Sequence, residues 1–350
     1  MPKDTPLLSL HKELKGRIVD FAGWNLPVMY TGIIEEHLAV RNQAGLFDVS
    51  HMGQAIVEGK DALAFLNYAF SNNYTAQKSM SVKYGIFCDK NGFPIDDLMV
   101  YKINDTKYLI VLNASNAEKD VIEMQKIAKD FDIKITDVSE NYSMLALQGK
   151  RAMEAFKNSF KGDFSNFKRF DIIEQDSMLI SYTGYTGSDG VEILCAPDKA
   201  TELAKKIFAE NNFVLPCGLG ARDSLRLEAR YPLYGHEISE SISAIEAGLS
   251  WAVKFDKDFQ GKDALLKMKE NPVQRKVKYF VVKDKRAVRQ GAEILQDGNK
   301  VATVLSGTYS PTLTAPIGSA LFENKDLPNT DLYVNIRDTK VNIELVEKFL

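Results

Sequence analysis

The sequence predicts a mixed antiparallel α+β protein with a separate, strand-rich domain at its C-terminal end. Strand-like and helix-like segments alternate, and several strands return through short turns, which favours antiparallel pairing over a doubly wound parallel sheet. The segment 267–276 (KMKENPVQRK) is charged, contains a proline and precedes a strand-rich stretch. We therefore expect a domain boundary that divides the chain into 1–270 and 271–350.

Turn and capping residues mark the elements in order. A helix is expected over 33–43, after Thr31 and with Gly45 as its stop. Strands at 98–103 and 108–113 are joined by the short polar turn NDT, which predicts a hairpin.

A capping box is expected to open the next helix, because Ser115 is followed by Glu118. The apolar positions along one side of that helix are Val121, Met124, Ala128 and Phe131. Further strands are expected at 133–138, 143–148, 178–182 and 191–195, with helices at 152–160 and from Pro197. In the last domain, Asp297-Gly298 is expected to turn 293–296 back into 301–305.

Composition is typical of a globular protein of 350 residues, with 45% hydrophobic residues, 26% charged residues and a formal net charge of -3. Such a length predicts two or three domains, and the small net charge gives no long-range attraction for nucleic acid or an acidic membrane. No apolar run approaches a membrane span, and the first residues lack the pattern of a signal or transit peptide. Cys88, Cys195 and Cys217 lie far apart, which predicts buried free thiols and a cytoplasmic protein.

Three arginines at four-residue spacing stand out in GLGARDSLRLEARYPLYG. If 221–229 is helical, Arg222, Arg226 and Arg230 share one face. Guanidinium groups there suit a carboxylate-bearing or planar anionic ligand. The alternative is a solvated face on which the arginines pair with nearby Asp223 and Glu228.

Two adjacent acids begin a predicted strand, and alternation places them on opposite faces. Asp97 shares its face with Met99 and Tyr101, where low polarity makes ionisation tunable and a flat ring could lie. Asp97 is therefore the better catalytic candidate. The alternative is that Asp96 and Asp97 are only turn residues that lead into the strand.

The segment SYTGYTGSDGVEI, residues 181–193, places glycines and tyrosines around Glu192. Glycines allow the backbone close to a ligand, and a carboxylate can accept from two donors on the edge of an amino-pyrimidine. The alternative is a glycine-rich hairpin with a solvated Glu192. It is not a phosphate loop, since neither GxxxxGK[ST] nor GxGxxG occurs.

The histidines do not form a triad or a metal site. Ser50 and His51 are adjacent on an extended segment and point apart, and His11, His37 and His236 have no companions at ligand spacing. Each is expected to be a surface or structural residue, and metal catalysis is disfavoured.

Eight stretches in one order resemble the aminomethyltransferase family, the T-protein of the glycine cleavage system, from Thr5 to nearly the last residue. They are VDFAGWNLPVMY, VRNQAGLFDVSHMG, IDDLMVYK, NASNAEKD, TGYTGSDGVEI, GLGARDSLRLEA with LYG, GLSWAVK and SGTYSPTL. The resemblance implies a three-domain cloverleaf around a folate cavity. On that plan, 1–270 is a folate-binding catalytic region of two interwoven lobes, and 271–350 is a β-barrel domain.

The resemblance also implies the reaction: an aminomethyl group on the dihydrolipoyl arm of the H-protein passes to tetrahydrofolate, giving methylenetetrahydrofolate and ammonia. Asp97 falls on the family's catalytic aspartate, Glu192 on the pterin-binding glutamate and Arg222 on a folate-binding arginine. The positions that line the folate cavity are Met52, Tyr84, Tyr101, Asn113, Tyr185 and Trp251.

The chain departs from its relatives at two places. It ends at VEKFL without the basic, aromatic tail seen in many relatives, and Arg286 and Arg289 are the candidates for that role. Phe167 stands where a tyrosine is frequent, and so lacks a hydroxyl.

Two alternative functions remain. A folate-binding assembly factor would carry a lysine-glycine-cysteine motif where this chain reads ARYPLYGHE. A folate-dependent demethylase of a small methylated compound would need no protein partner.

Overall fold

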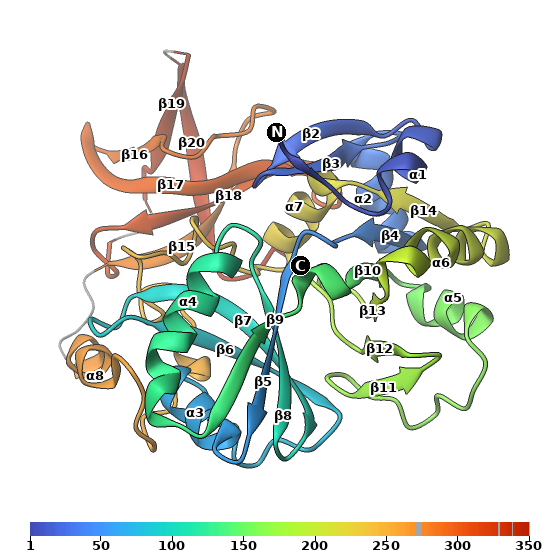
Figure 1. Cartoon of the computed structure of the whole chain (residues 1–350). Coiled ribbons are helices and arrows are strands. Elements are labelled where there is room, and N and C mark those ends of the chain that lie inside the picture. Colours follow the sequence, from blue (N-terminus) through green and yellow to red (C-terminus); the bar gives the residue numbers. More distant parts are fainter. Residues whose placement is uncertain (271–274, 328–329, 338, 350) are drawn as a thin grey trace.

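The computed structural model describes residues 1–270, 275–327, 330–337 and 339–349, and these form three lobes around a common centre (Figure 1). Two lobes are built on sheets with helices, and the third is a closed β-barrel. The predicted α+β class and cloverleaf arrangement are confirmed.

The first lobe is a five-stranded antiparallel sheet in the order β6-β7-β8-β5-β9. Its strands are β5 (Gly53–Gly59), β6 (Ser81–Cys88), β7 (Pro94–Asn104), β8 (Lys107–Leu112) and β9 (Ile133–Asp137). Its core forms between this sheet and the helices α3 (Ala62–Ala69) and α4 (Ala117–Ile127), which continues as a 3-10 turn over Ala128–Asp130. The predicted β7–β8 hairpin is confirmed.

The predicted capping box is wrong. The helix α4 begins at Ala117, Asn116 occupies the N-cap position, and no side chain caps the first turn. Ser115 is an exposed turn residue. The reason is a tertiary contact: Asn116 Nδ2 donates to Asp96 Oδ1 at 2.7 Å, which fixes the entry of the helix from outside it.

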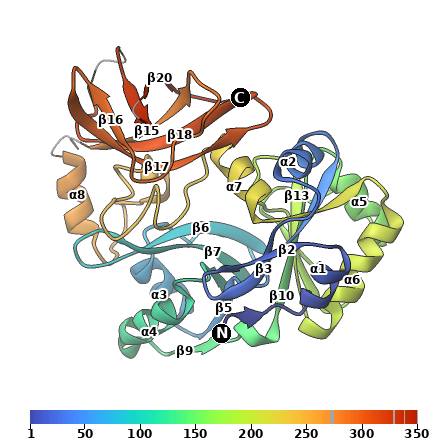
Figure 2. The same cartoon turned by 90° about the horizontal axis from the view of Figure 1, so that it is seen from above.

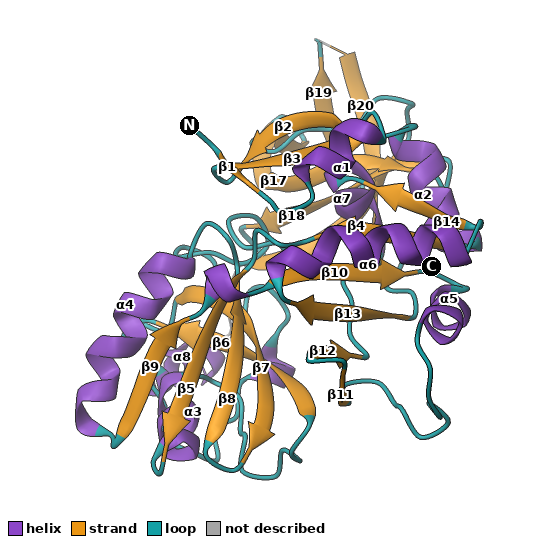
Figure 3. Cartoon of the chain, turned by 45° about the vertical axis from the view of Figure 1, so that its right-hand side comes forward, coloured by secondary structure: helices purple, strands orange, loops and turns teal. Residues whose placement is uncertain are grey.

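The second lobe is a six-stranded sheet in the order β11-β12-β13-β10-β4-β14, in which only the β14–β4 pair is parallel among the described residues. Its strands are β4 (Ala44–Asp48), β10 (Ser143–Gln148), β11 (Ile172–Gln175), β12 (Met178–Ser181), β13 (Gly190–Cys195) and β14 (Val214–Cys217). The helices α5 (Ala152–Ser159) and α6 (Pro197–Glu210) pack on it, and Figure 3 shows α6 running along β10. The expected first-turn proline of α6 is confirmed.

The expectation that Gly45 ends a helix is wrong. The helix α2 (Ile33–Asn42) has already ended, and Gly45 lies inside β4. A Cβ there would lie 2.5 Å from Cys217 Sγ and 2.7 Å from Val40 Cγ2. Glycine is therefore required because β14 and α2 approach the strand closely. Thr31 is not the helix cap either, since Gly32 holds that position and Thr31 N–H donates to the Glu36 carboxylate.

A small N-terminal sheet stands beside the second lobe. It has the order β1-β3-β2 and consists of β1 (Lys3–Asp4), β2 (Arg17–Phe21) and β3 (Trp24–Met29), with α1 (Leu8–Glu13) between the first two strands. No helix among the described residues is both long and apolar enough to cross a membrane. All three cysteines are buried free thiols, as predicted.

The third lobe is a barrel closed in the order β15-β18-β17-β16-β19-β20. Its strands are β15 (Lys276–Val282), β16 (Glu293–Gln296), β17 (Asn299–Ser310), β18 (Ala315–Phe322), β19 (Tyr333–Ile336) and β20 (Thr339–Val346). The expected β16–β17 turn is confirmed, with φ of 49° at Asp297 and 81° at Gly298. The helix α8 (Lys262–Glu270) ends just before 271–274, where the predicted domain boundary lies outside the described residues.

The helix α7 (Leu219–Glu228) lies between the barrel and α2 (Figure 2). Arg226 is only 1% exposed and forms 2.8 Å ion pairs with Glu237 and Asp223, while its Nη2 donates to Ser306 of the barrel. The predicted three-arginine face is wrong, because Arg230 follows the helix with a φ of 59° and is exposed.

Glu228 is the second buried charge of α7. Its carboxylate pairs with Arg41 of α2 at 2.9 Å, lies 3.1 Å from His37 Nε2 and accepts the hydroxyl of Ser310 in the barrel. Burial raises the pKa of Glu228, but the bonds from His37 and Ser310 and the charge of Arg41 outweigh burial and lower it to about 2. This carboxylate joins three elements from different parts of the chain.

We expect Glu228→Gln to lower the free energy of unfolding by about 3 kcal/mol at pH 7, because Arg41 would keep a largely buried charge without its partner. The pKa of Glu228 is below its ordinary value, so its stabilisation is present above pH 4.5 and is lost as the pH falls toward 2. Denaturant unfolding at pH 7 and pH 3 should show a difference from wild type that shrinks at pH 3. The control is Glu154→Gln in the exposed Arg151 pair, which should change stability little.

Candidate functional site

The two acids of β7 point to opposite faces, as predicted. Asp96 is completely buried on the side of the core shared with α4. Asp97 is half-buried on the other face, where Met99 and Tyr101 pack in the core between the first and second lobes. Alternation along one strand thus separates a buried carboxyl from one that faces the centre of the molecule.

Asp97 is held by two side chains. Tyr84 of β6 donates its hydroxyl to Oδ2 at 2.9 Å, and Asn113 donates from Nδ2 to Oδ1 at 2.9 Å. Burial and the charge of Asp96 raise the pKa of Asp97 to about 7, against the lowering effect of these two bonds. A carboxyl with such a pKa changes charge near neutral pH, which is typical of catalytic acids and bases.

An aromatic surface adjoins Asp97. The ring of Tyr84 lies against Trp251, with centroids 5.3 Å apart and planes inclined by 30°. Trp251 belongs to the 3-10 turn Ser250–Ala252 and is 59% exposed, unusual for so large an apolar side chain. The indole therefore offers a face to a ligand close to the donor that holds Asp97.

Glu192 lies on β13 at the end of a hydrogen-bonded chain of side chains. Tyr101 and Ser181 hydroxyls are 3.0 Å apart, Ser181 and Thr183 hydroxyls are 2.6 Å apart, and Thr183 donates to Glu192 Oε2 at 2.5 Å. Burial raises the pKa of Glu192, while Thr183 and Arg222 oppose the rise. Sequence reasoning missed Ser181 and Thr183, although both lie in the segment that drew attention to Glu192.

Arg222 is in the first half of α7, one turn before Arg226. Its guanidinium lies 4.7 Å from the centre of the Tyr185 ring, and its Nη1 is buried without a hydrogen-bond partner among the described residues. Burial lowers the pKa of Arg222, and the charge of Glu192 opposes this. A buried donor without a partner is costly, so this nitrogen suits an acceptor on a ligand.

Tyr185 is influenced both by the group around Asp97 and by the group formed by Glu192 and Arg222. It stacks on Tyr231, with centroids 5.8 Å apart, and its hydroxyl donates to the carbonyl of Pro232. Burial raises its pKa, and the charges of Asp97 and Arg222 both act on it. The Asp97 group and the Glu192–Arg222 group therefore lie within electrostatic reach of one another.

Of the remaining predicted residues, Met52 packs against the same core as Tyr101, while Phe167 packs on Phe156 in the second lobe. Arg286 pairs with Asp284 through its Nε and Nη2. The other candidate for the role of the basic tail, Arg289, is exposed.

The histidines have structural partners in most cases. His11 and His37 are buried against Asp48 and Glu228, and His236 Nδ1 lies 2.8 Å from the Leu305 carbonyl. His51 is also buried, and burial and the charge of Arg222 lower its pKa to about 4, against the charge of Asp48.

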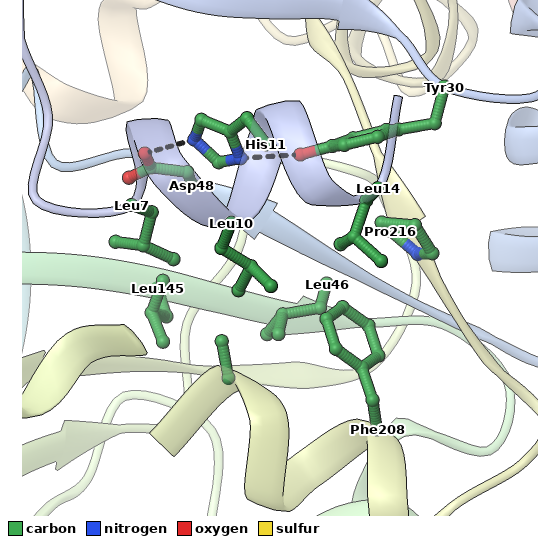
Figure 4. A pocket seen from close by; sticks show the side chains of 11 residues that line it. Leu7, Leu10, His11, Leu14, Tyr30, Leu46, Asp48, Leu145, Phe208 and Pro216 are labelled. Carbon is green, nitrogen blue, oxygen red and sulfur yellow. Dashed lines mark hydrogen bonds and ion pairs between the residues drawn. The ribbon is translucent and has the colours of Figure 1, made fainter. Parts of the chain in front are cut away.

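A small pocket elsewhere in the second lobe is distinct from this site. In Figure 4 the ring of His11 bridges Asp48 and the hydroxyl of Tyr30, both at 2.8 Å, above a floor of leucines from α1, β4 and β10. The residues that line it include none of the predicted site residues.

Comparison with known proteins identifies the family. The model described as "GCVT N-terminal domain" matches residues 7–257, and "Glycine cleavage T-protein C-terminal barrel domain" matches residues 275–350. The chain belongs to the glycine cleavage T-protein family. The resemblance predicted from the eight sequence stretches is thereby confirmed.

The relatives are similar over nearly their whole length. An aminomethyltransferase of Thermosipho melanesiensis is 41% identical, with 99% of this chain and 96% of the relative covered. An aminomethyltransferase of Bacillus subtilis is 42% identical, with 99% and 98% covered. The crystal structure of the glycine cleavage system aminomethyltransferase T from Bartonella henselae has a TM-score of 0.95 at 30% identity, covering 100% of this chain and 98% of that one. These findings support the predicted activity, tetrahydrofolate-dependent aminomethyl transfer, and favour it over the two alternatives.

Proposed function

We propose that this chain takes the aminomethyl group from the S-aminomethyldihydrolipoyl arm of an H-protein and transfers its carbon to tetrahydrofolate. The carbon–sulfur bond breaks and returns a thiol to the arm, two carbon–nitrogen bonds form to the folate, and the amine leaves as ammonia. The observation that carries the proposal is the aspartate at the family position, Asp97, whose carboxyl is held on one side by the Tyr84 hydroxyl and on the other by the Asn113 amide. Burial and the charge of Asp96 raise its pKa to about 7.

The residues present suit a folate. A flat heterocycle needs an aromatic face and an edge acceptor, and the Tyr185 and Trp251 rings and the Glu192 carboxylate have these properties. The unpartnered Nη1 of Arg222 suits an acceptor on the ligand. Met52, Tyr84, Tyr101 and Asn113 complete the proposed folate site around these groups.

Asp97 is the proposed catalytic residue. Tetrahydrofolate supplies the nucleophilic nitrogens that accept the one-carbon unit. The ionised carboxylate of Asp97 would stabilise the positive charge that develops as the carbon leaves sulfur, and Tyr84 and Asn113 hold it in one orientation. Burial strengthens this effect, because fewer water molecules screen the charge.

We also propose that the protein works in the cytoplasm, where its three buried thiols would stay reduced. The division into a folate-binding catalytic region, 1–270, of two interwoven lobes and a barrel domain, 271–350, is part of the same proposal. Arg226 is not part of the proposed ligand site, because it is buried and ion-paired.

The first test compares two donors of the aminomethyl group. With aminomethylated H-protein and tetrahydrofolate, we expect ammonia release. A free lipoyl analogue bearing the same group should react far more slowly, since it lacks the docking energy that holds the arm in place. Equal efficiency for the free analogue would remove the partner from the proposal, and no release from either donor would remove the reaction.

Asp97→Asn should lower turnover about a hundredfold or more, because it keeps the shape of the side chain but removes the charge. Folate should still bind. In wild type, turnover should fall as the pH drops below about 7, as Asp97 takes up its proton. The matched control is Asp96→Asn, which should be much milder in folded protein. Greater damage from the Asp96 change would contradict the assignment of Asp97.

Glu192→Ala should weaken tetrahydrofolate binding at least about tenfold, because donors on the pterin edge would be left without an acceptor. The control is Glu174→Ala, an exposed glutamate on β11 of the same sheet. Titration calorimetry measures both. Unchanged affinity for Glu192→Ala would place the pterin elsewhere.

A further inference from the structure

A third acid lies behind Asp96. Asp120 is on the first turn of α4, is completely buried, and neither of its carboxyl oxygens receives a hydrogen bond from any described N–H or O–H group. The feature is unexpected, because an ionised buried carboxylate without a donor is strongly disfavoured. Asp120 is the last residue of the stretch NASNAEKD.

Asp96 is surrounded by donors, in contrast to Asp120. Its Oδ1 accepts from Asn113 Nδ2 at 2.9 Å and from Asn116 Nδ2 at 2.7 Å, and its Oδ2 accepts the backbone N–H of Asn113 at 3.1 Å. These donors favour the anion on Asp96. Asp120 lies one helical turn after Asn116: its backbone N–H donates to the Asn116 carbonyl at 2.8 Å, and the Asn116 side chain bonds Asp96. The Asp120 carboxyl is thereby in hydrogen-bonding contact with Asp96. Two buried carboxylates in such contact cannot both be ionised, so one proton must lie between them.

We propose that Asp120 is a neutral carboxylic acid that donates its proton in a hydrogen bond to ionised Asp96, and that it acts as a positioning residue for Asp97. The pair then carries a single negative charge beside the catalytic carboxyl. The inference rests on the proposed role of Asp97 and extends it.

The route from Asp120 to Asp97 passes through Asn113. The amide nitrogen of Asn113 donates to Asp96 Oδ1 and to Asp97 Oδ1, both at 2.9 Å, so both carboxyl groups depend on the position of one side chain. Holding Asp96 as an anion keeps this amide oriented with its donors toward the acids. The charge of Asp96 is also what raises the pKa of Asp97, after burial itself.

Among the described residues, the other charged and hydroxyl groups near the three acids do not donate to Asp96 or Asp120. The Lys119 ammonium opposes the rise in the pKa of Asp120, but it donates to Ile95 O at 3.1 Å and pairs with Glu240 at 2.9 Å, and not with any of the three acids. The Tyr234 hydroxyl donates to the Pro94 carbonyl. Tyr84 donates to Asp97, and Tyr185 donates to Pro232.

The directions of the pKa shifts agree with the proposal. Burial, followed by the charge of Asp96 and the hydrogen bond to it, raises the pKa of Asp120 to about 10. Burial raises the pKa of Asp96 above its ordinary value, and the hydrogen bonds from Asp120, Asn113 and Asn116 oppose this rise. The hydrogen bond thus raises the pKa of Asp120 and opposes the rise in the pKa of Asp96, which favours the proton on Asp120.

The first experiment detects the proton directly and needs no activity. Infrared spectra of wild type minus Asp120→Asn are recorded at pH 8.5, where Asp97 is ionised. We expect the carbonyl band of one protonated carboxylic acid, whereas the control difference, wild type minus Glu118→Gln, should show a carboxylate band from the exposed acid on the same helix. A carboxylate band for Asp120 would overturn the proposal. If the Asp120 variant does not fold, carbon-13 NMR of carboxyl-labelled aspartate in wild type gives the same answer, with one aspartate still protonated at pH 8.5.

The second experiment tests the effect on Asp97 through the pH dependence of turnover. Asp120→Asn keeps an N–H donor and the single charge of the pair, so the loss of activity at low pH should stay at the wild-type pH. Asp120→Val removes the donor, so Asp96 takes up a proton more easily and its repulsion of Asp97 weakens. The activity loss should then move to lower pH by about one unit.

The comparison of Asp120→Asn with Asp120→Val distinguishes a role in positioning Asp97 from a role in packing alone, because only asparagine keeps the donor to Asp96. If the valine and asparagine variants shift the profile alike, or if valine leaves it unmoved, the positioning role is wrong. If turnover has no acidic limb in wild type, the proposed role of Asp97 fails, while the infrared result on Asp120 stands by itself.

Discussion

Buried charge on the helix α7 is the interaction on which the arrangement of the lobes depends. Arg226 and Glu228 lose almost all contact with water, so each must find charged and hydrogen-bonding partners, and those partners come from α2, from the segment after α7 and from the barrel. Such a network tolerates little displacement, because moving one lobe would strip partners from a buried ion. The position of α7 between the lobes is thereby fixed.

The same helix then presents Arg222 to the site. Arg222 and Arg226 are four residues apart and face a similar direction, yet their surroundings differ: every nitrogen of Arg226 has an acceptor, whereas Nη1 of Arg222 has none among the described residues. Arg226 holds the lobes together, whereas Arg222 has an N–H donor, unpaired within the described part of the chain, beside Glu192 and Tyr185. This contrast in hydrogen bonding distinguishes a structural arginine from one that suits a ligand.

Much of the fold followed from local sequence patterns, because alternation and turn residues act over a few neighbours. The opposite faces of Asp96 and Asp97 follow from the twofold period of a strand. The Asp297-Gly298 turn was predictable because aspartate and glycine tolerate the positive φ angles that it requires. The errors at Gly45 and Ser115 have another origin. Both elements are positioned by tertiary contacts, Cys217 and Val40 around Gly45 and Asp96 beside Asn116, which no local pattern contains.

The candidate site shows the same division. Asp97, Glu192 and Arg222 stood out because their residue types are conspicuous in their segments, and the structure brings them into one electrostatic neighbourhood. Thr183 and Asp120 did not stand out, since a threonine in a loop and an acid in a first helical turn are ordinary where they occur. Their importance arises only when folding places the threonine on a buried glutamate and the acid against a buried aspartate.

The placement of the reactive groups between lobes has a physical consequence for a two-substrate reaction. In the proposed reaction a folate and a carrier-bound carbon would both have to reach Asp97, so the carboxyl could not lie within the core of one lobe. Strand β7 meets this requirement. One side of the strand buries Asp96 against α4, and the other side places Asp97 toward the second lobe and near Tyr84, which contacts the exposed indole of Trp251. Burial on one face thus sets the charge environment, while access on the other face leaves room for chemistry. A single strand can bury one carboxyl and leave the next one accessible, because neighbouring side chains on a strand point in opposite directions.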